Sequence, residues 1–199
     1  MRVCFLDSDI VLRMYPVETI NHSLALATLL LQILGIAFLV LFFITRKSGG
    51  WQSDLQPIAN FLGKRGLWIG LALTLGGTGF SLFYSEVLGI APCGLCWLQR
   101  VFLYPQALLF AVALWKKERA VVDYSIALSI FGSAVALYQH YLQMGGTSVL
   151  PCPAVATKAA DCAQRFLFEF GYITFPMMSL TIFAFLIVLM LFVRRRANT

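Results

Sequence analysis

The stretch SLALATLLLQILGIAFLVLFFIT, from Ser23 to Thr45, contains no Asp, Glu, Lys or Arg. A helix of about 20 mostly apolar residues is long enough to cross the hydrocarbon core of a membrane. Four further stretches are also mostly apolar with at most one charged residue each, and their apolar residues lie all round the helix, which favours spanning helices over surface-lying ones. The five predicted spans are Ser23–Thr45, Leu67–Leu88, Leu98–Trp115, Val121–Tyr141 and Thr174–Val193.

The composition of the whole chain agrees with a membrane protein. Of its 199 residues, 60% are hydrophobic and 12% are charged, whereas about 25% of the residues of a soluble domain are charged. So few charges cannot cover a water-facing surface, which argues against a soluble enzyme, a nucleic-acid-binding protein and a disordered chain. The net charge of +6 does not indicate nucleic-acid binding, because the basic residues stand at the ends of the apolar stretches.

Most of the basic residues fall into three clusters that orient the chain. Ten of the 15 Lys and Arg residues lie between the first two spans, between the third and fourth, and after the fifth. Five alternating spans place these clusters on one side, which the positive-inside rule identifies as the cytoplasm. The N-terminus is then expected outside and the basic tail Arg194–Thr199 inside. The ten residues are Arg46, Lys47, Lys64, Arg65, Lys116, Lys117, Arg119, Arg194, Arg195 and Arg196.

The first span is expected to be a retained helix rather than a cleaved signal peptide. More than 20 residues precede it, and its apolar core exceeds the about 7–15 residues of a signal peptide. No cleavage site of the small-x-small type follows it. Translation could start at Met1 or at Met14, and the sequence leaves both open.

The predicted topology, which was built from charge and hydropathy, places every cysteine outside. The segment between the second and third spans holds a C-x-x-C motif, and the segment between the fourth and fifth spans holds a second pair. The outer side of a bacterial-type membrane permits disulfide bonds. The five cysteines are Cys4, Cys93, Cys96, Cys152 and Cys162.

The C-x-x-C motif has the features of a redox-active pair. Cys96 lies near the start of the third span, where the helix N-terminus favours a thiolate. Arg100 follows one helical turn later on the same face, and its guanidinium keeps its positive charge. The spacing alone leaves two alternatives: a static disulfide between Cys93 and Cys96, or a zinc site shared with Cys152 and Cys162.

The second pair lies in a long outer loop. Pro151 and Pro153 flank Cys152, so no helix runs through that cysteine. A loop of this kind could present a disulfide to another protein. Taken by itself, however, the loop is better explained by a disulfide between Cys152 and Cys162 that only staples it.

Residues 93–105, CGLCWLQRVFLYP, strongly resemble the thiol–quinone oxidoreductases of the DsbB family and are closest to its BdbC-like branch. The resemblance covers roughly residues 66–193. It implies an all-α integral membrane protein, with a four-helix transmembrane bundle built from spans two to five and one additional N-terminal transmembrane helix. Residues 1–65 form an extension with the extra span and a cytosolic linker, and residues 194–199 form the basic tail. The family does not explain this extension or Cys4.

The resemblance implies an enzyme that generates disulfides in the bacterial cytoplasmic (inner) membrane. A DsbA-like thioredoxin-fold protein with a reduced dithiol would attack the Cys152–Cys162 disulfide, with Cys152 forming the mixed disulfide. Thiol–disulfide exchange would pass the electrons to the Cys93–Cys96 disulfide. Cys96 would then reduce a membrane quinone (ubiquinone or menaquinone), and Cys93 would close the disulfide again.

The resemblance also implies two quinone contacts. Arg100 matches the family's arginine at this motif position, which stabilises the thiolate and contacts the quinone; snorkelling to the outer headgroups is the alternative. His140, near the end of the fourth span, precedes Cys152 by an interval similar to that of a histidine near the quinone in the family. Beside its aromatic neighbours, His140 could equally be an interface residue.

Two other functions compete with the oxidase. One is a quinone reductase of the vitamin-K-epoxide-reductase type, in which electrons flow in the opposite direction. Its second cysteine pair lies in a different loop, which disfavours it. The other is a non-enzymatic membrane scaffold held together by structural disulfides.

Overall fold

Five long helices account for most of the computed structural model, which describes residues 17–46, 52–147 and 161–197. All five are long and apolar enough to cross a membrane. Each of the five predicted spans coincides for most of its length with one of them, so the all-helical membrane fold is confirmed. In chain order the elements are α2 (Val17–Arg46), α3 (Gln52–Leu82) with the π-helical turn η1 (Phe83–Val87), α4 (Gly94–Lys116), α5 (Val121–Gln143) and α6 (Phe175–Ala197).

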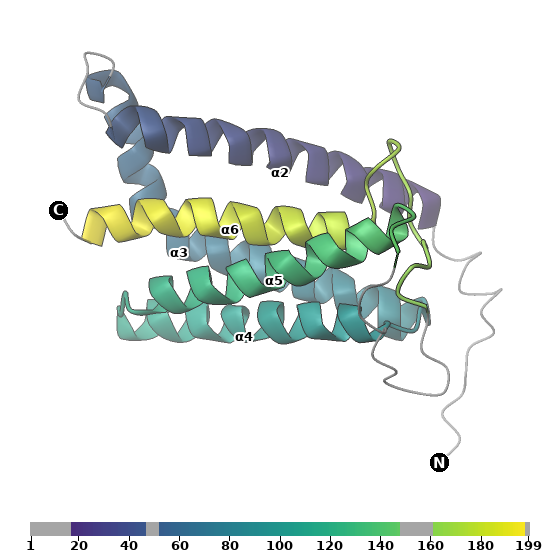
Figure 1. Cartoon of the computed structure of the whole chain (residues 1–199). Helices are drawn as coiled ribbons and strands as arrows, with labels where there is room; N and C mark the ends of the chain where they lie inside the picture. The colour runs from purple at the N-terminus through teal and green to yellow at the C-terminus, as the bar shows by residue number, and fades with distance from the viewer. Residues whose placement is uncertain (1–16, 47–51, 148–160, 198–199) are drawn as a thin grey trace.

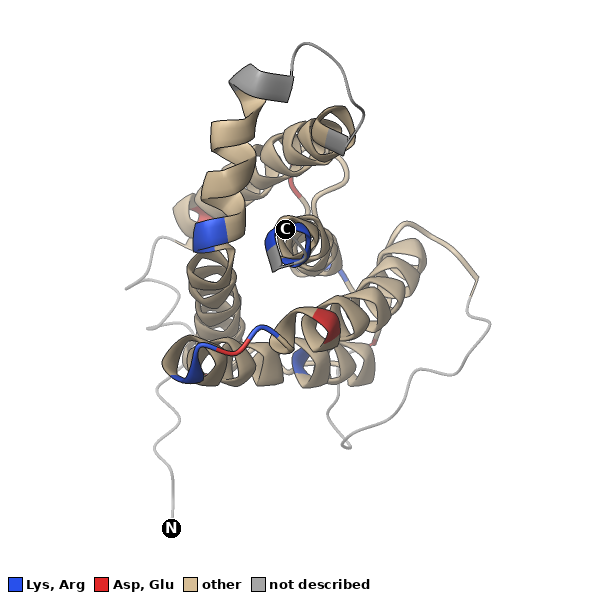
Figure 2. Cartoon of the chain, turned by 90° about the vertical axis from the view of Figure 1, so that its left-hand side faces the viewer, with Lys and Arg blue, Asp and Glu red and all other residues tan. Residues whose placement is uncertain are grey.

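Successive helices run in opposite directions, and α6 lies in the middle of the bundle (Figures 1 and 2). The helix α6 packs against α2, α3 and α5, while α2 lies at the edge of the bundle against α6 and α3. Phe183, Leu186 and Leu189 of α6 are completely buried. The four helices α3 to α6 therefore form a core bundle, and α2 is added to its outside.

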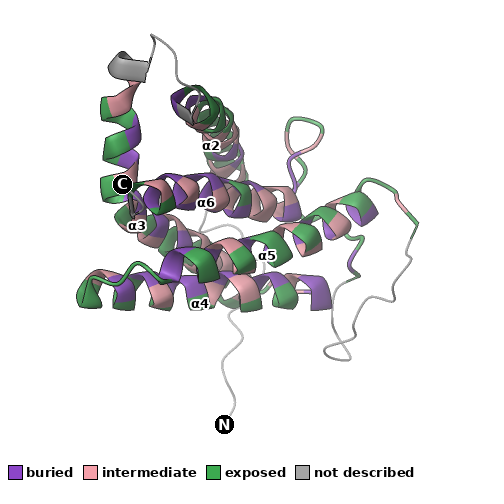
Figure 3. Ribbon diagram, turned by 60° about the vertical axis from the view of Figure 1, so that its left-hand side comes forward, coloured by how far each residue is buried: buried purple, intermediate pink, exposed green. Residues whose placement is uncertain are grey.

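The outer faces of the bundle are apolar and exposed, as a lipid-facing surface requires. Figure 3 shows exposed residues along the outer faces of α2, α4 and α5. Ile36 on α2, Leu108 on α4 and Phe131 on α5 are 65%, 72% and 62% exposed. In water these side chains would be a liability, whereas lipid tails solvate them at no cost.

Small residues let the helices of the core approach one another closely. At Gly132 of α5, a Cβ atom would come within 2.5 Å of the Phe183 ring on α6, and at Gly66 of α3 it would come within 2.3 Å of Val193. Either contact is too short for a real side chain. Close backbone approach of this kind is a main source of helix association in membranes.

The helix α3 begins at Gln52, well before the predicted start of the span at Leu67. Part of the segment that was expected to be a cytosolic linker is therefore helical. The difference has a simple cause, because Lys64 and Arg65 interrupt the apolar stretch without disfavouring a helix. The charged residues show where the membrane-spanning part of α3 ends, but the helix itself extends beyond them.

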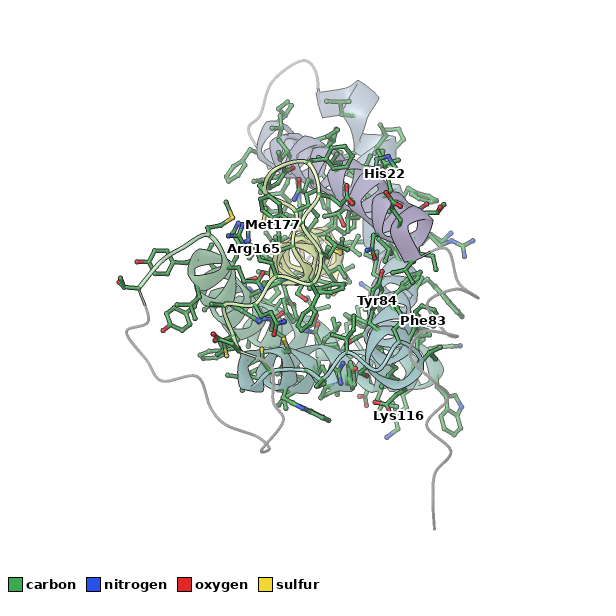
Figure 4. The ribbon with its side chains drawn as sticks, turned by 90° about the vertical axis from the view of Figure 1, so that its right-hand side faces the viewer. His22, Phe83, Tyr84, Lys116, Arg165 and Met177 are labelled. Atoms are coloured by element: carbon green, nitrogen blue, oxygen red, sulfur yellow. The ribbon has the colours of Figure 1, made fainter. Side chains whose placement is uncertain are left out.

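The two ends of the bundle differ in chemistry. Cys93, Cys96 and Cys162 lie at the end where α2, α4 and α6 begin, which is the end that Figure 4 views. Lys and Arg residues gather at the opposite end, on α3, in the α4–α5 connection and at the end of α6 (Figure 2). The cysteine end and the basic end are thus on opposite sides of a layer that the five helices cross.

The connection that leads into α6 folds back on itself beside α2. Glu169 and Ile173 form an isolated antiparallel bridge around a turn in which Phe170 and Gly171 have φ angles of 52° and 78°. Ile173 and Leu167 are buried in a cluster with Ala25 of α2. This segment before α6 is therefore a turn, and it packs against α2.

Candidate active site

Cys93 and Cys96 meet at the N-terminus of α4. Cys93 is the N-cap residue, and its Sγ accepts a hydrogen bond from the backbone N–H of Cys96 at 3.3 Å. Both cysteines are free thiols, and their Sγ atoms are 2.8 Å apart. The free N–H groups and dipole of a helix N-terminus favour negative charge at this place. The pair is therefore close enough to form a disulfide and is placed to stabilise a thiolate.

The two thiols are not equivalent. Cys93 is 2% exposed, and its hydrogen bond to Cys96, together with burial, raises the pKa of the Cys93 thiol. Both sulfurs border the cavity described below, and Cys96 is the more exposed of the two.

A buried glutamine on α5, Gln139, contacts both sulfurs. Its Nε2 donates to the Sγ atoms of Cys93 and Cys96 at 3.1 and 3.2 Å, and only 1% of the residue is exposed. Gln99 of α4 donates from Nε2 to the Oε1 atom of Gln139 at 2.6 Å. This bond turns the amide so that its N–H groups face the sulfurs. The motif thus receives hydrogen bonds from a helix distant in the sequence.

Arg100 contacts Ser81, near the end of α3, and the neighbouring Trp97. Its Nε and one terminal nitrogen donate to the hydroxyl and carbonyl oxygens of Ser81, both at 3.0 Å, and its guanidinium carbon lies 5.2 Å from the ring centre of Trp97. The residue is 9% exposed. Within the described ranges no carboxylate forms an ion pair with it. A buried, unneutralised guanidinium beside Cys96 is costly in a membrane and so indicates a role in the site.

A cavity of about 380 Å³ opens beside the motif, within the size range of small-molecule sites. One end is polar and is formed by Cys93, Cys96, Gln99, Arg100 and Gln139. Away from that end, the helices α2, α3 and α6 line the cavity mainly with apolar side chains. These include Leu24, Leu31, Leu73, Phe80, Met178 and Ile182.

Cys162 approaches the same motif from the loop before α6. It is 1% exposed and belongs to one buried cluster with Cys93, Leu95 and Leu142. Cys162 is disulfide-bonded, in contrast to the two free thiols of the motif. Cys152, the other cysteine predicted to act in the loop, lies outside the described residues, as does Cys4. The structure thus brings Cys162 and the C-x-x-C motif into one cluster.

His140, in contrast, is not among the residues that line the cavity. Its Nδ1 lies 3.0 Å from the hydroxyl of Thr174, at the start of α6. The preceding residue, Gln139, is the one that reaches the sulfurs. A quinone contact by His140 stays a prediction. The sequence marks Gln139 only as one of several polar residues in this membrane helix, beside His140 and Gln143.

Comparison with known protein families shows which family this chain belongs to. The family model for the disulfide bond formation protein DsbB matches residues 64–193, which is most of the chain. The chain belongs to the DsbB family. No solved structure gives a significant match to it.

Individual relatives agree with this DsbB-family assignment. A SPbeta prophage-derived disulfide bond formation protein B of Bacillus subtilis is 37% identical over 112 residues, which cover 56% of this chain and 74% of the relative. A probable disulfide formation protein of Chlamydia caviae is 36% identical over 120 residues, 60% of this chain and 84% of the relative. Disulfide bond formation protein C of Bacillus subtilis is 31% identical over 113 residues, 55% and 78% of the two chains.

The family and the fold together establish the general activity. This DsbB-family chain is a multi-pass membrane protein and a disulfide-generating oxidoreductase. The matched residues 64–193 contain α4, α5 and the C-x-x-C motif, whereas α2 lies entirely outside them.

Proposed function

We propose that this enzyme reoxidises a DsbA-like thioredoxin-fold protein and passes the electrons to a membrane quinone. The partner's dithiol is oxidised to a disulfide while the Cys152–Cys162 disulfide is reduced. That new dithiol is oxidised again as it reduces the Cys93–Cys96 disulfide. Each exchange breaks one S–S bond, forms another and moves two electrons and two protons.

The buried cluster around Cys93 supports the exchange between the two cysteine pairs. Cys162 shares this cluster with Cys93, and Gln143 of α5 donates from Nε2 to the carbonyl oxygen of Gln164 at 2.9 Å. This bond ties the loop after Cys162 to the helix that carries Gln139. Exchange needs an attacking thiolate close to a disulfide sulfur, and the cluster keeps one sulfur of each pair near the other.

The cavity beside Cys96 is the single observation that carries the quinone part of the proposal. A quinone has polar carbonyl oxygens on an apolar body, and the cavity combines the Arg100 guanidinium with apolar walls. When bound, the quinone would accept the two electrons and two protons of the reduced motif. Arg100 would donate hydrogen bonds to a carbonyl oxygen there, and Gln139 would stabilise the thiolate of Cys96.

A coupled assay tests this function. Purified protein in detergent is mixed with a reduced DsbA-like protein and a ubiquinone or menaquinone analogue, and partner thiols and quinone absorbance are followed together. We expect both signals to fall in step, and neither to fall when the enzyme, the partner or the quinone is left out. Absence of thiol-dependent quinone reduction with several partners and both quinone classes would refute the proposal.

We also propose that the cysteine end of the bundle faces the extracytoplasmic side, since the basic end obeys the positive-inside rule. Two exposed residues at opposite ends offer a matched pair, Lys116 and Met144. Each is replaced by Cys in a variant whose native cysteines are Ser, and intact cells are treated with a membrane-impermeant maleimide. We expect labelling of Met144→Cys but of Lys116→Cys only after permeabilisation. The reverse pattern would invert the topology.

A further inference from the structure

The helix α2 lies outside the residues that match the family, yet it lines the cavity of the candidate active site. Four of its residues, which recur on one helical face, border this cavity: Leu24, Ala27, Thr28 and Leu31. On the far side of α2, Leu30 and Ile33 are 60% and 63% exposed. One face of α2 is therefore a wall of the cavity, and the other faces lipid.

The cavity is elongated along the helices. It extends from Leu24 to Leu31 on α2 and from Phe175 to Ile182 on α6. At 1.5 Å per helical residue, each of these stretches is about 10 Å long. A ligand that fills this space has a compact polar part at Cys96 and Arg100 and a chain-like apolar part between α2 and the core bundle.

Side-chain hydrogen bonds hold α2 in place at three depths. Tyr84, which borders the cavity, donates from its hydroxyl to Oδ1 of Asn21 near the start of α2. In the middle, Gln32 donates from Nε2 to the hydroxyl of Thr181 on α6 at 3.0 Å. At the basic end, a terminal nitrogen of Arg195 donates to the hydroxyl of Thr45 at 2.8 Å. Hydrogen bonds between polar side chains hold membrane helices together. The three contacts therefore hold α2 against the bundle that carries the candidate site.

Two contacts join α2 to the loop before α6. Tyr172 donates from its hydroxyl to Oε1 of Gln32 at 2.8 Å, and Nδ1 of His22 lies 3.6 Å from a carboxylate oxygen of Glu169. Figure 4 shows His22 and Tyr84 at the cysteine end of the bundle. The loop that follows Cys162 and the wall formed by α2 are thus one packed unit.

We propose that α2 forms the binding surface for the apolar tail of the quinone and selects substrates by that tail. The inference rests on the proposed quinone function and deepens it. A ring without a tail would occupy only the polar end, which α4, α5 and the end of α3 provide. A long isoprenoid or alkyl tail would lie against Leu24, Ala27 and Leu31, so this enzyme should prefer long-tailed quinones more strongly than the core bundle alone would.

Photolabelling of the unmodified protein tests where the tail lies. A quinone analogue that carries a photoreactive group on its tail is cross-linked to the purified protein, and the labelled peptides are identified by mass spectrometry. We expect label on residues 24–31 of α2, and we expect an excess of unlabelled long-tailed quinone to remove it. If unlabelled quinone removes the label but the label lies only on α3, α4 or α6, the role of α2 would be overturned while the quinone site would stand. Label that no quinone displaces would overturn both.

A matched pair of alanines on α2 tests the selection. Both alanines are exposed on the surface of α2, but only Ala27 lines the cavity. We expect Ala27→Phe to weaken direct binding of a long-tailed quinone by at least about tenfold, because overpacking a site costs about 1–3 kcal/mol. Binding of a tail-less quinone should stay unchanged, and Ala37→Phe should change neither. Equal effects of the two variants, or an equal loss for both quinones, would contradict the proposal.

Discussion

Replacing Cys96 by Ser is expected to abolish turnover, with a loss of at least about 1,000-fold, the scale seen when an enzyme loses its nucleophile. Cys96 lines the cavity and is the more exposed of the two cysteines, at a helix N-terminus and 3.2 Å from the Nε2 atom of Gln139. A serine hydroxyl fills the same space but forms neither a thiolate nor a disulfide. The rate of quinone reduction with a reduced DsbA-like protein is the measurement.

The same variant separates the two halves of the reaction. Cys96→Ser should still oxidise one equivalent of the partner through the loop disulfide, with no quinone reduced, so a single burst should replace steady turnover. Cys4→Ser is the matched control, because Cys4 lies outside the matched family residues, and it should turn over at the wild-type rate. Steady quinone reduction by Cys96→Ser would exclude this cysteine as the electron donor.

Replacing Arg100 by Ala is expected to raise the KM for the quinone by about 10- to 100-fold. The guanidinium is buried, lines the cavity and is held in place by Ser81. A hydrogen bond to a charged group contributes about 1.5–3 kcal/mol, and 1.4 kcal/mol corresponds to a factor of ten. Initial rates over a range of quinone concentrations provide the KM, with the partner protein held at saturation.

Two further substitutions identify the cause of that change. Arg100→Lys keeps the charge but loses the planar fork that Ser81 holds, so its KM should lie between those of wild type and Arg100→Ala. Arg165→Ala removes an exposed charge at the same end of the bundle, and its KM should equal that of wild type. Unchanged kinetics in Arg100→Ala would leave snorkelling as the role of this residue.

The sequence was sufficient to predict the transmembrane architecture, because the absence of charge over about 20 residues reports directly on the membrane core. The helix ends were harder to predict. Glu18 lies in the first turn of α2, where a negative charge is favourable, yet hydropathy alone starts that span at Ser23. Charged residues end a membrane span without ending a helix, so both α2 and α3 extend beyond the predicted spans.

The candidate site was predictable only where it is local in the sequence. Cys93, Cys96 and Arg100 lie within two helical turns, so their proximity follows from helix geometry. Gln139 reaches the sulfurs from 43 residues away, and this contact depends on how α5 packs against α4. The resemblance pointed to His140, whose quinone contact stays a prediction; in the structure Gln139 contacts the sulfurs and His140 contacts Thr174.

The wall formed by α2 could not be predicted either. Its sequence reads as an ordinary apolar span, and the family match does not include it. The structure places α2 against the bundle through contacts that include those of Asn21, Gln32 and Thr45. A polar residue in an apolar helix indicates a partner in the membrane, but the sequence does not say which helix provides it.

A single-turnover experiment without oxygen tests the central claim most directly. The enzyme is first reduced at Cys93 and Cys96 and then mixed with a limiting amount of quinone, after which the remaining quinone and the state of each cysteine are determined. The account predicts one quinone reduced for each Cys93–Cys96 disulfide formed, with no other cysteine needed. Quinone reduction without that disulfide, or formation of the disulfide without loss of quinone, would contradict it.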